Sequence, residues 1–313
     1  MLKSVDRHAL GACVARHGSS ILPPGTNPSF LIPTTSQCYD EDMRNSLRFA
    51  FIFLVLLTLP ALLALPVKAT SQQAYQDYLY QFDLYRQTNT DFQVAKNEYL
   101  KFKSLTSQTT TLEKTKTMLS QRDELLRAYL FLLNEKLNED RGLTATGKQL
   151  YQALIANEVT FLNAHKDRMT SIGSIEDTVN SSKELESHYT ILYASMRQTI
   201  IGIILGNLSV HAQRFDTIGT TAQALVNTNR GAFTPQKQAT IDRWLLQIAN
   251  KRSLYQQKIE AINTTNNQLK SNYQEEIDRS FQAMQKDAGE AKQYLAEATG
   301  NLTELMNALR YQD

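Results

Sequence analysis

The sequence predicts an all-α protein. The expected fold is an elongated helical bundle or antiparallel coiled coil, built from two long arms with shorter middle helices and preceded by one hydrophobic N-terminal helix. From Thr70 onward the chain has a single proline, Pro235, and no cysteine. Apolar side chains recur there with alternating spacings of three and four residues, which is typical of packed helices. One uncharged apolar run, residues 49–65, precedes this region.

Residues 1–42 differ in composition from the rest of the chain. They are rich in glycine, proline and serine, they lack helical periodicity, and they hold both cysteines, Cys13 and Cys38. Such a segment cannot bury enough apolar surface to fold, so we predict a disordered leader. Two interpretations remain open: a short cytoplasmic tail, or translation from a mis-set start upstream of Met43.

The apolar run predicts where the chain that follows it resides. It begins at Phe49, ends at Leu65 and contains no charged residue, while Arg44 and Arg48 precede it. An apolar segment behind positive charge directs a chain across a membrane. The sequence therefore predicts export of residues 70–313, either out of the cell or into the cell envelope.

Residues 43–69 are interpreted either as a cleaved signal peptide or as a retained N-terminal membrane anchor. As a helix the run would span roughly 26 Å, slightly less than a hydrocarbon core of about 30 Å. Pro60 and Pro66 break the helix ahead of a small-x-small pattern that ends at Ala69, which is typical of a cleavage site. Cleavage before Thr70 is preferred; a retained run would make a single-pass membrane protein.

Charge argues against nucleic acid as a partner. The chain has 33 Lys and Arg and 31 Asp and Glu; six basic and four acidic residues precede Thr70, which leaves 27 of each. These charges alternate in sign, whereas binding by counterion release needs a concentrated basic patch. We expect protein partners or self-association through the heptad seams, and membrane contact through residues 49–65 if they are not cleaved.

The first long arm is predicted over residues 71–138. Its first half carries a helical seam of aromatic residues, and its second half carries a ladder of leucines spaced by seven. Toward the end of the arm the apolar stripe widens, which indicates more than one partner helix. The seam consists of Tyr75, Tyr78, Phe82, Tyr85, Asn89, Phe92, Lys96 and Tyr99, and the ladder of Leu105, Leu112, Leu119, Leu126 and Leu133.

Two middle helices are predicted at residues 148–170 and 175–227. A polar and glycine-containing break at residues 138–147 separates the first of them from the long arm. Ser174 and Asp177 have the spacing of a capping box, which predicts the start of the second middle helix.

The most apolar stretch after the leader is residues 200–208. It is too short to span a bilayer, so a buried crossing within the bundle is the preferred interpretation. Insertion into a membrane after rearrangement is the alternative. Gly202 and Gly206 form a small-xxx-small pair in this stretch, which predicts a close helix contact.

The second long arm is predicted over residues 235–311. Thr234 fits an N-cap with Pro235 at the first helical position. The seam that follows is the longest regular pattern in the chain, with one stutter after Tyr273. A continuous helix would reach on the order of 110 Å, and the polar run at residues 263–267 is its predicted weak point.

The two arms have similar lengths and can be joined by a helical hairpin. We expect them to lie antiparallel, while the middle helices thicken one end into a four-helix section. Arm ends with only a narrow apolar stripe can pair between chains. Arg252 and Asn266 at seam positions would then fix the register.

No motif for catalysis or metal binding is present in the sequence. The histidines after the leader, His165, His188 and His211, form no zinc-binding pattern, and neither a nucleophile elbow nor a phosphate-binding glycine loop occurs. We therefore expect a protein that is not an enzyme, with no catalytic residue, no cofactor and no metal.

The sequence favours an exported or membrane-anchored, extracytoplasmic helical protein that acts through protein–protein interaction as a structural or adhesion element of the cell envelope. A cysteine-free exported chain of this size indicates a bacterial source. Two alternatives remain. One is a periplasmic-type ligand-sensing four-helix bundle, and the other is a helical pore-forming protein, which rests on residues 200–208.

Overall fold

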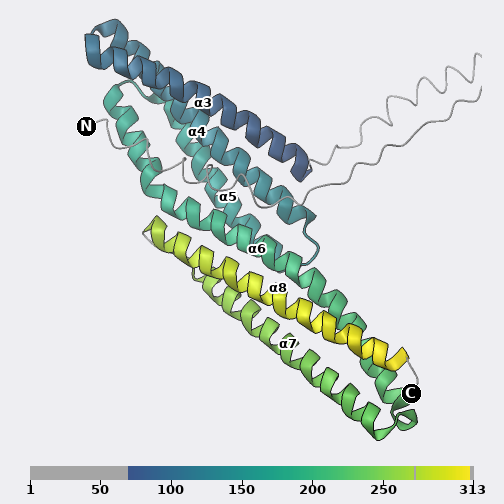
Figure 1. Cartoon of the computed structure of the whole chain (residues 1–313). Helices are drawn as coiled ribbons and strands as arrows, with labels where there is room; N and C mark the ends of the chain where they lie inside the picture. The colour runs from purple at the N-terminus through teal and green to yellow at the C-terminus, as the bar shows by residue number, and fades with distance from the viewer. Residues whose placement is uncertain (1–69, 271–272, 311–313) are drawn as a thin grey trace, which may run out of the picture. The chain divides into compact units, whose positions relative to one another are not determined.

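The computed structural model describes residues 70–270 and 273–310 and shows an all-α bundle (Figure 1). Within these ranges the chain forms α-helices and two short 3-10 turns, and no strand is present, which confirms the predicted fold class. The predicted leader and membrane segment lie outside the described residues, and with them Arg44, Arg48, Phe49, Leu65 and Ala69.

Within the described residues, six α-helices follow one another with short connections. They are α3 (Ser71–Phe102), α4 (Leu105–Glu139), α5 (Ala145–Arg168), α6 (Ile175–Asn229), α7 (Pro235–Asn267) and α8 (Gln274–Arg310), with 3-10 turns at Met169–Ser171 and Arg230–Ala232. The capping box of Ser174 and Asp177 is present at the start of α6, and Thr234 caps α7 with Pro235 at its first turn.

Helix α6 is shared by two groups of helices (Figure 1). Helices α3 and α4 form an antiparallel hairpin, α5 packs on α4, and the first half of α6 packs on α4 and α5. Helices α7 and α8 form a second hairpin, which packs along the second half of α6. Because α6 belongs to both groups, its side chains connect the whole described part of the chain.

The two predicted arms do not lie against each other. Each arm instead doubles back on itself, because α3 takes α4 and α7 takes α8 as its main packing partner. The heptad pattern predicted the apolar stripes but contained no information on which stripe would cover which. Helix α6, predicted as a shorter middle helix, is the longest helix described, with 55 residues.

The turn between α3 and α4 is the break that the sequence analysis missed. It contains neither glycine nor proline. Lys103 turns the chain in the left-handed conformation with φ of 49°, which is uncommon for a residue with a side chain. The Ser104 hydroxyl then accepts a hydrogen bond from the Ser107 N–H and begins α4.

The second break falls at the predicted weak point. Helix α7 ends at Asn267, the last residue of the polar run at residues 263–267. Asparagine and threonine side chains compete for backbone hydrogen bonds, which lowers the cost of leaving the helix there. The chain reverses before Gln274, where α8 begins.

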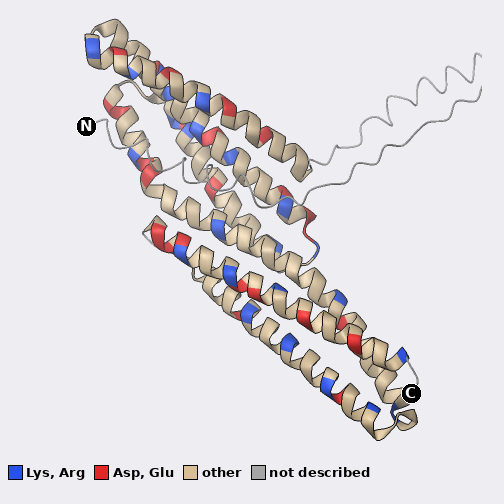
Figure 2. Cartoon of the chain, viewed as in Figure 1, with Lys and Arg blue, Asp and Glu red and all other residues tan. Residues whose placement is uncertain are grey.

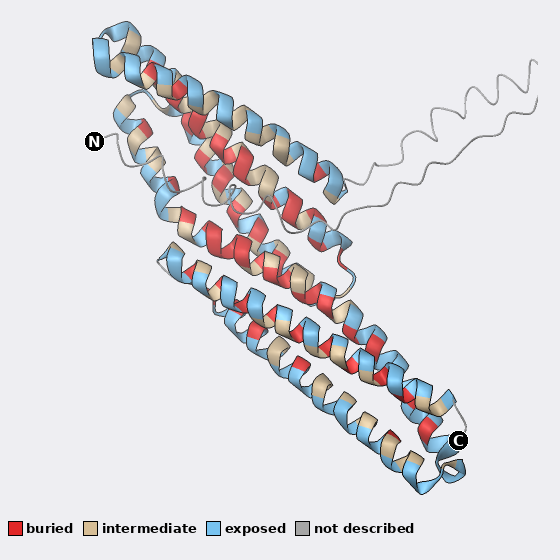
Figure 3. Cartoon of the chain, in the orientation of Figure 1, coloured by how far each residue is buried: buried red, intermediate tan, exposed pale blue. Residues whose placement is uncertain are grey.

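The buried residues concentrate where α4, α5 and the first half of α6 meet (Figure 3). From the leucine ladder, Leu119, Leu126 and Leu133 are buried, because this part of α4 is covered by several helices. Leu105 stands at the hairpin turn instead and is 79% exposed. Tyr75, predicted in the aromatic seam, is exposed at the opposite end of α3.

One carboxylate ties the start of α3 to the end of α4. Glu139 accepts hydrogen bonds from the Ser71 N–H at 2.7 Å and from the Ser71 hydroxyl at 2.6 Å. These bonds lower the pKa of Glu139 below its ordinary value of 4.5. These hydrogen bonds to the charged carboxylate therefore stabilise the fold above pH 4.5, and this stabilisation is lost as the pH falls through the lowered pKa of Glu139.

We expect the Glu139→Gln variant to melt at a lower temperature than the native chain at neutral pH, because the charged acceptor at a helix N-terminus is lost. The difference should shrink on acidification and disappear well below the ordinary pKa of glutamate. Thermal unfolding followed by circular dichroism at several pH values measures this. A difference that is independent of pH would contradict it.

Candidate functional site

Two histidine–carboxylate pairs are enclosed where α4, α5 and α6 meet. We name them the buried polar cluster. Each pair takes its members from two helices and adds a serine from α6. The cluster consists of Asp123 on α4, Glu158 and His165 on α5, and Ser181, His188 and Ser195 on α6.

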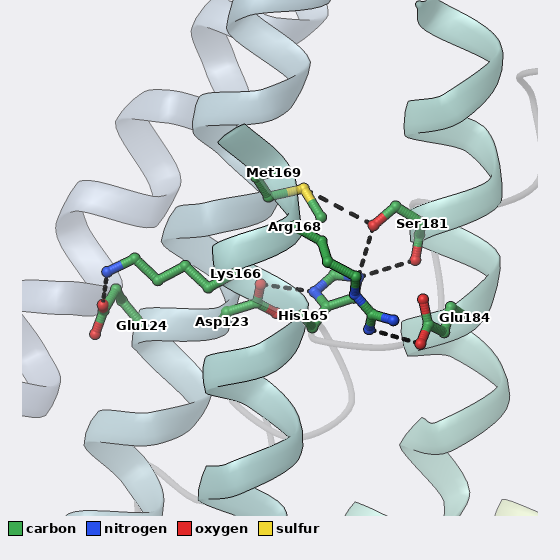
Figure 4. Close-up of polar contacts among 8 residues, drawn as sticks. All are labelled: Asp123, Glu124, His165, Lys166, Arg168, Met169, Ser181 and Glu184. Atoms are coloured by element: carbon green, nitrogen blue, oxygen red, sulfur yellow. Dashed lines mark hydrogen bonds and ion pairs between the residues drawn. The ribbon is translucent and has the colours of Figure 1, made fainter. Parts of the chain in front are cut away.

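The first pair links all three helices (Figure 4). Asp123 Oδ2 lies 2.7 Å from His165 Nδ1, and both side chains have no exposed surface. On the other side of the ring, His165 Nε2 lies 2.8 Å from Ser181 Oγ and 3.0 Å from the Ser181 carbonyl oxygen. The imidazole of α5 therefore bridges a carboxyl group of α4 and the backbone of α6.

The order Asp123, His165, Ser181 resembles the arrangement that activates a serine nucleophile, but the proton positions differ. A carbonyl oxygen can only accept, so the Ser181 carbonyl requires a proton on His165 Nε2. The Ser181 hydroxyl is directed toward Met169 Sδ, 3.8 Å away. With its proton on Nε2 the ring cannot take the proton of Ser181, and these contacts join α4, α5 and α6.

Burial also changes the pKa of the carboxyl group in this pair. Desolvation raises the pKa of Asp123 above its ordinary value of 3.8, although the hydrogen bond and charge of His165 act against it. The neighbouring Arg122 is buried as well, and its charge lowers the pKa of Asp123 only in part. Burial therefore favours the neutral form of the Asp123 carboxyl group, whereas the hydrogen bond to His165 favours its charged form.

The second pair lies earlier on α5 and later on α6 than the first pair. His188 Nε2 is 2.7 Å from Glu158 Oε2, and the Ser195 hydroxyl donates to Glu158 Oε1 at 3.0 Å. Glu158 and Ser195 are buried, whereas the side chain of His188 keeps 23% of its surface exposed. Phe161 stacks on the His188 ring with 3.6 Å between centroids and lies 6.0 Å from the His165 ring.

Two ion pairs lie beside the cluster at the surface (Figure 4). Lys166 pairs with Glu124 between α5 and α4, and Arg168 pairs with Glu184 at 2.6 Å between α5 and α6. Their side chains are between 26% and 51% exposed, so solvent screens the charges and each pair contributes little to stability. Figure 2 shows that charges of both signs are scattered over the helices.

The link between α6 and α8 is a second enclosed polar contact. The Arg197 guanidinium lies 4.6 Å from the Tyr193 ring centroid and 4.3 Å from that of Phe281, which places the cation between two aromatic faces. Arg197 also donates to Asp278 Oδ1 at 3.0 Å, and the Tyr193 hydroxyl bonds to both partners. This contact fixes the start of α8 on α6.

Gly202 and Gly206 are both buried on α6, opposite α5 and the turn that precedes it. A Cβ atom at Gly202 would lie 2.3 Å from the Tyr151 ring, and one at Gly206 would lie 2.4 Å from the Asp140 carboxylate. On the facing turn, a Cβ at Gly142 would lie 1.8 Å from the Gly206 carbonyl oxygen. Three glycines therefore permit the approach of the α4–α5 turn and α5 to α6.

Arg252 and Asn266, the seam residues predicted to fix register between chains, both have partners within this chain. Arg252 donates to the two carboxylate oxygens of Asp216 on α6, at 2.8 Å each. The side-chain NH2 of Asn266 donates to the Tyr151 hydroxyl at 3.1 Å, and the backbone carbonyl of Asn266 accepts from the Gln198 side chain at 2.7 Å. These contacts fix α7 against α6 and α5.

The apolar stretch at residues 200–208 lies inside this packing. By length and composition alone, the stretch Ile175–Ala232 could cross a membrane, which by itself is weak evidence for a membrane span. In this structure 72% of its most apolar window is buried within the fold. A core helix passes the same test. Among the described residues, no three histidine, cysteine or acidic side chains gather closely enough to hold a metal ion.

The buried polar cluster was not predicted, although the seam of α5 contains an indication of it. Glu158 and His165 occupy the seam positions between Ile155, Leu162 and Met169, which are all buried. A polar residue within an otherwise apolar seam predicts a buried partner on another helix. Compared with known protein families, curated proteins and solved structures, the chain matches none of them.

Proposed function

We propose that this protein is exported and works outside the cytoplasm as a non-enzymatic helical element of the cell envelope, through contacts with other proteins or with copies of itself. The observation that carries the proposal is the uncharged run 49–65 behind Arg44 and Arg48. A run of this kind directs the chain that follows it across a membrane.

The packing of the described residues supports a structural role. The polar groups of the buried cluster bond mainly to one another, and the Ser181 carbonyl fixes the His165 proton. An arrangement of this kind holds helices together and leaves no activated nucleophile. The surfaces that remain for partners are the exposed faces of the helices and the ends of the two hairpins (Figure 3).

The pore-forming alternative receives less support. Membrane insertion of residues 200–208 would require α5 and the α4–α5 turn to leave α6, and with them the contacts at Gly202 and Gly206. The ligand-sensing alternative would be favoured by a small molecule that binds between the helices.

The location is tested by labelling intact cells of the native host. Leu246 on α7 is 62% exposed, and the chain after the leader has no cysteine, so a Leu246→Cys variant with Cys13→Ser and Cys38→Ser carries one accessible thiol. We expect a maleimide that cannot cross the cytoplasmic membrane to label this variant in intact cells. The same chain without Leu246→Cys is the matched control. Labelling that requires cell lysis would contradict export.

A further inference from the structure

The turn between α3 and α4 exposes apolar side chains that the fold does not use. We name residues 99–105 the α3–α4 tip. Leu100 is 51% exposed, Phe102 63% and Leu105 79%, the largest exposure among the large hydrophobic residues described. Figure 3 shows this end of the hairpin as exposed surface. Three large apolar groups together at one hairpin end are typical of a contact site.

The charges at the tip have one sign. Lys101 and Lys103 stand between the three apolar residues, and they are the only charged residues from position 99 to position 112. Around them the chain carries serine and threonine, and the nearest acidic residues along the chain are Glu98 on α3 and Glu113 on α4, which lie just outside this stretch.

Hydrogen bonds within the α3–α4 tip fix its conformation without a partner. The Lys103 N–H donates to the Tyr99 carbonyl at 2.9 Å, and the Ser104 hydroxyl caps α4. The Lys101 ammonium lies 4.9 Å from the centroid of the Phe102 ring, so the cation and the ring face outward as a unit. A preformed turn binds a surface with a small loss of conformational freedom.

We propose that the α3–α4 tip binds an anionic lipid surface, with Leu100, Phe102 and Leu105 entering the headgroup boundary and Lys101 and Lys103 contacting lipid phosphates. Exposed apolar groups that alternate with lysine suit a membrane interface, where the alkyl part of lysine also reaches apolar surface. The inference rests on the proposed function for the presence of a membrane beside the chain, and it deepens that function by naming a surface that the protein contacts.

The test places a fluorescent reporter at the tip itself, because the leader can also bind lipid. Trp244 is the only tryptophan, so a Trp244→Phe chain with Phe102→Trp carries a single indole at the tip. The full chain is reconstituted into vesicles of brominated phosphatidylcholine, with or without phosphatidylglycerol. We expect quenching and a blue shift of this indole in the anionic vesicles, and a weaker response in the neutral ones. Added salt should reduce the difference.

Two matched pairs of variants separate the tip from general surface effects. Lys101→Gln with Lys103→Gln should weaken the response on the order of thirtyfold in lipid concentration, whereas Lys286→Gln with Lys292→Gln on α8 removes the same charge elsewhere and should leave it intact. Leu105→Ser should reduce the response, and Leu246→Ser, at an exposed position of α7, should not.

Equal emission in neutral and anionic vesicles, or a response that survives the tip substitutions, would overturn the proposal. Circular dichroism confirms that each variant keeps its helices. Because thiol labelling of intact cells measures export independently, a failed tip response and a failed export experiment can be told apart.

Discussion

Replacing Asp123 with alanine is expected to lower the free energy of unfolding by about 3 kcal/mol, because the variant leaves a buried imidazole without its partner. Asp123 and His165 are fully enclosed and 2.7 Å apart, so water cannot replace the lost carboxyl group. Denaturant titration followed by circular dichroism measures the change.

The Arg168–Glu184 pair provides the control for this prediction. It also joins neighbouring helices, at 2.6 Å, but 51% and 42% of the two side chains is exposed. Glu184→Ala should therefore cost less than about 1 kcal/mol. Replacing Asp123 and His165 together with leucine should be less harmful than Asp123→Ala alone, since neither the imidazole nor the carboxyl group is then left buried without the other. Equal effects of Asp123→Ala and Glu184→Ala would show that the buried pair has no special role.

Replacing Gly142 with alanine is expected to destabilise the fold by about 3 kcal/mol, because the added methyl group overlaps backbone. The new Cβ would lie 1.8 Å from the Gly206 carbonyl oxygen. The turn cannot shift freely, since Asp140 Oδ1 accepts from the Gly142 and Leu143 N–H groups at 2.8 Å each and its carboxylate lies against Gly206. Thermal and denaturant unfolding measure the loss.

Gly219 offers the matched control on α6, because a Cβ there would meet nothing within 4 Å. Gly219→Ala should stabilise the protein by about 0.5–1 kcal/mol through the higher helix propensity of alanine. Opposite signs at Gly142 and Gly219 would identify close packing as the cause. If Gly142→Ala is as stable as the native chain, the described approach of the turn to α6 is wrong.

The positions of most helices could be predicted because local sequence determines them. The Ser174 capping box and the Thr234–Pro235 pair mark helix starts through hydrogen bonds within a few residues, and the structure contains both. The turn at Lys103 could not be predicted, because nothing in its side chain requires a left-handed backbone. It forms because α3 and α4 gain by packing together, which is a property of distant residues.

The buried polar cluster was harder to predict than the helices that hold it. Heptad spacing places His165 on the buried face of α5, but it does not identify Asp123, which is 42 residues away, as the partner. Pairing depends on which stripes meet, and the spacing of an apolar stripe does not identify the stripe that will cover it. For the same reason the two arms were expected to pair with each other, whereas each doubles back.

The most direct test of the proposed export of residues 70–313 is the N-terminus of the protein recovered from its native host. Mass analysis of the intact chain, combined with separation of cytoplasm, membranes and external fractions, shows what has happened to residues 49–65. We predict a species that begins at Thr70 or Ser71 and is found outside the cytoplasm. A membrane-bound species that retains Phe49 would show that residues 49–65 are kept as a membrane anchor and are not cleaved. A soluble cytoplasmic chain that still contains Phe49 and Leu65 would contradict export itself.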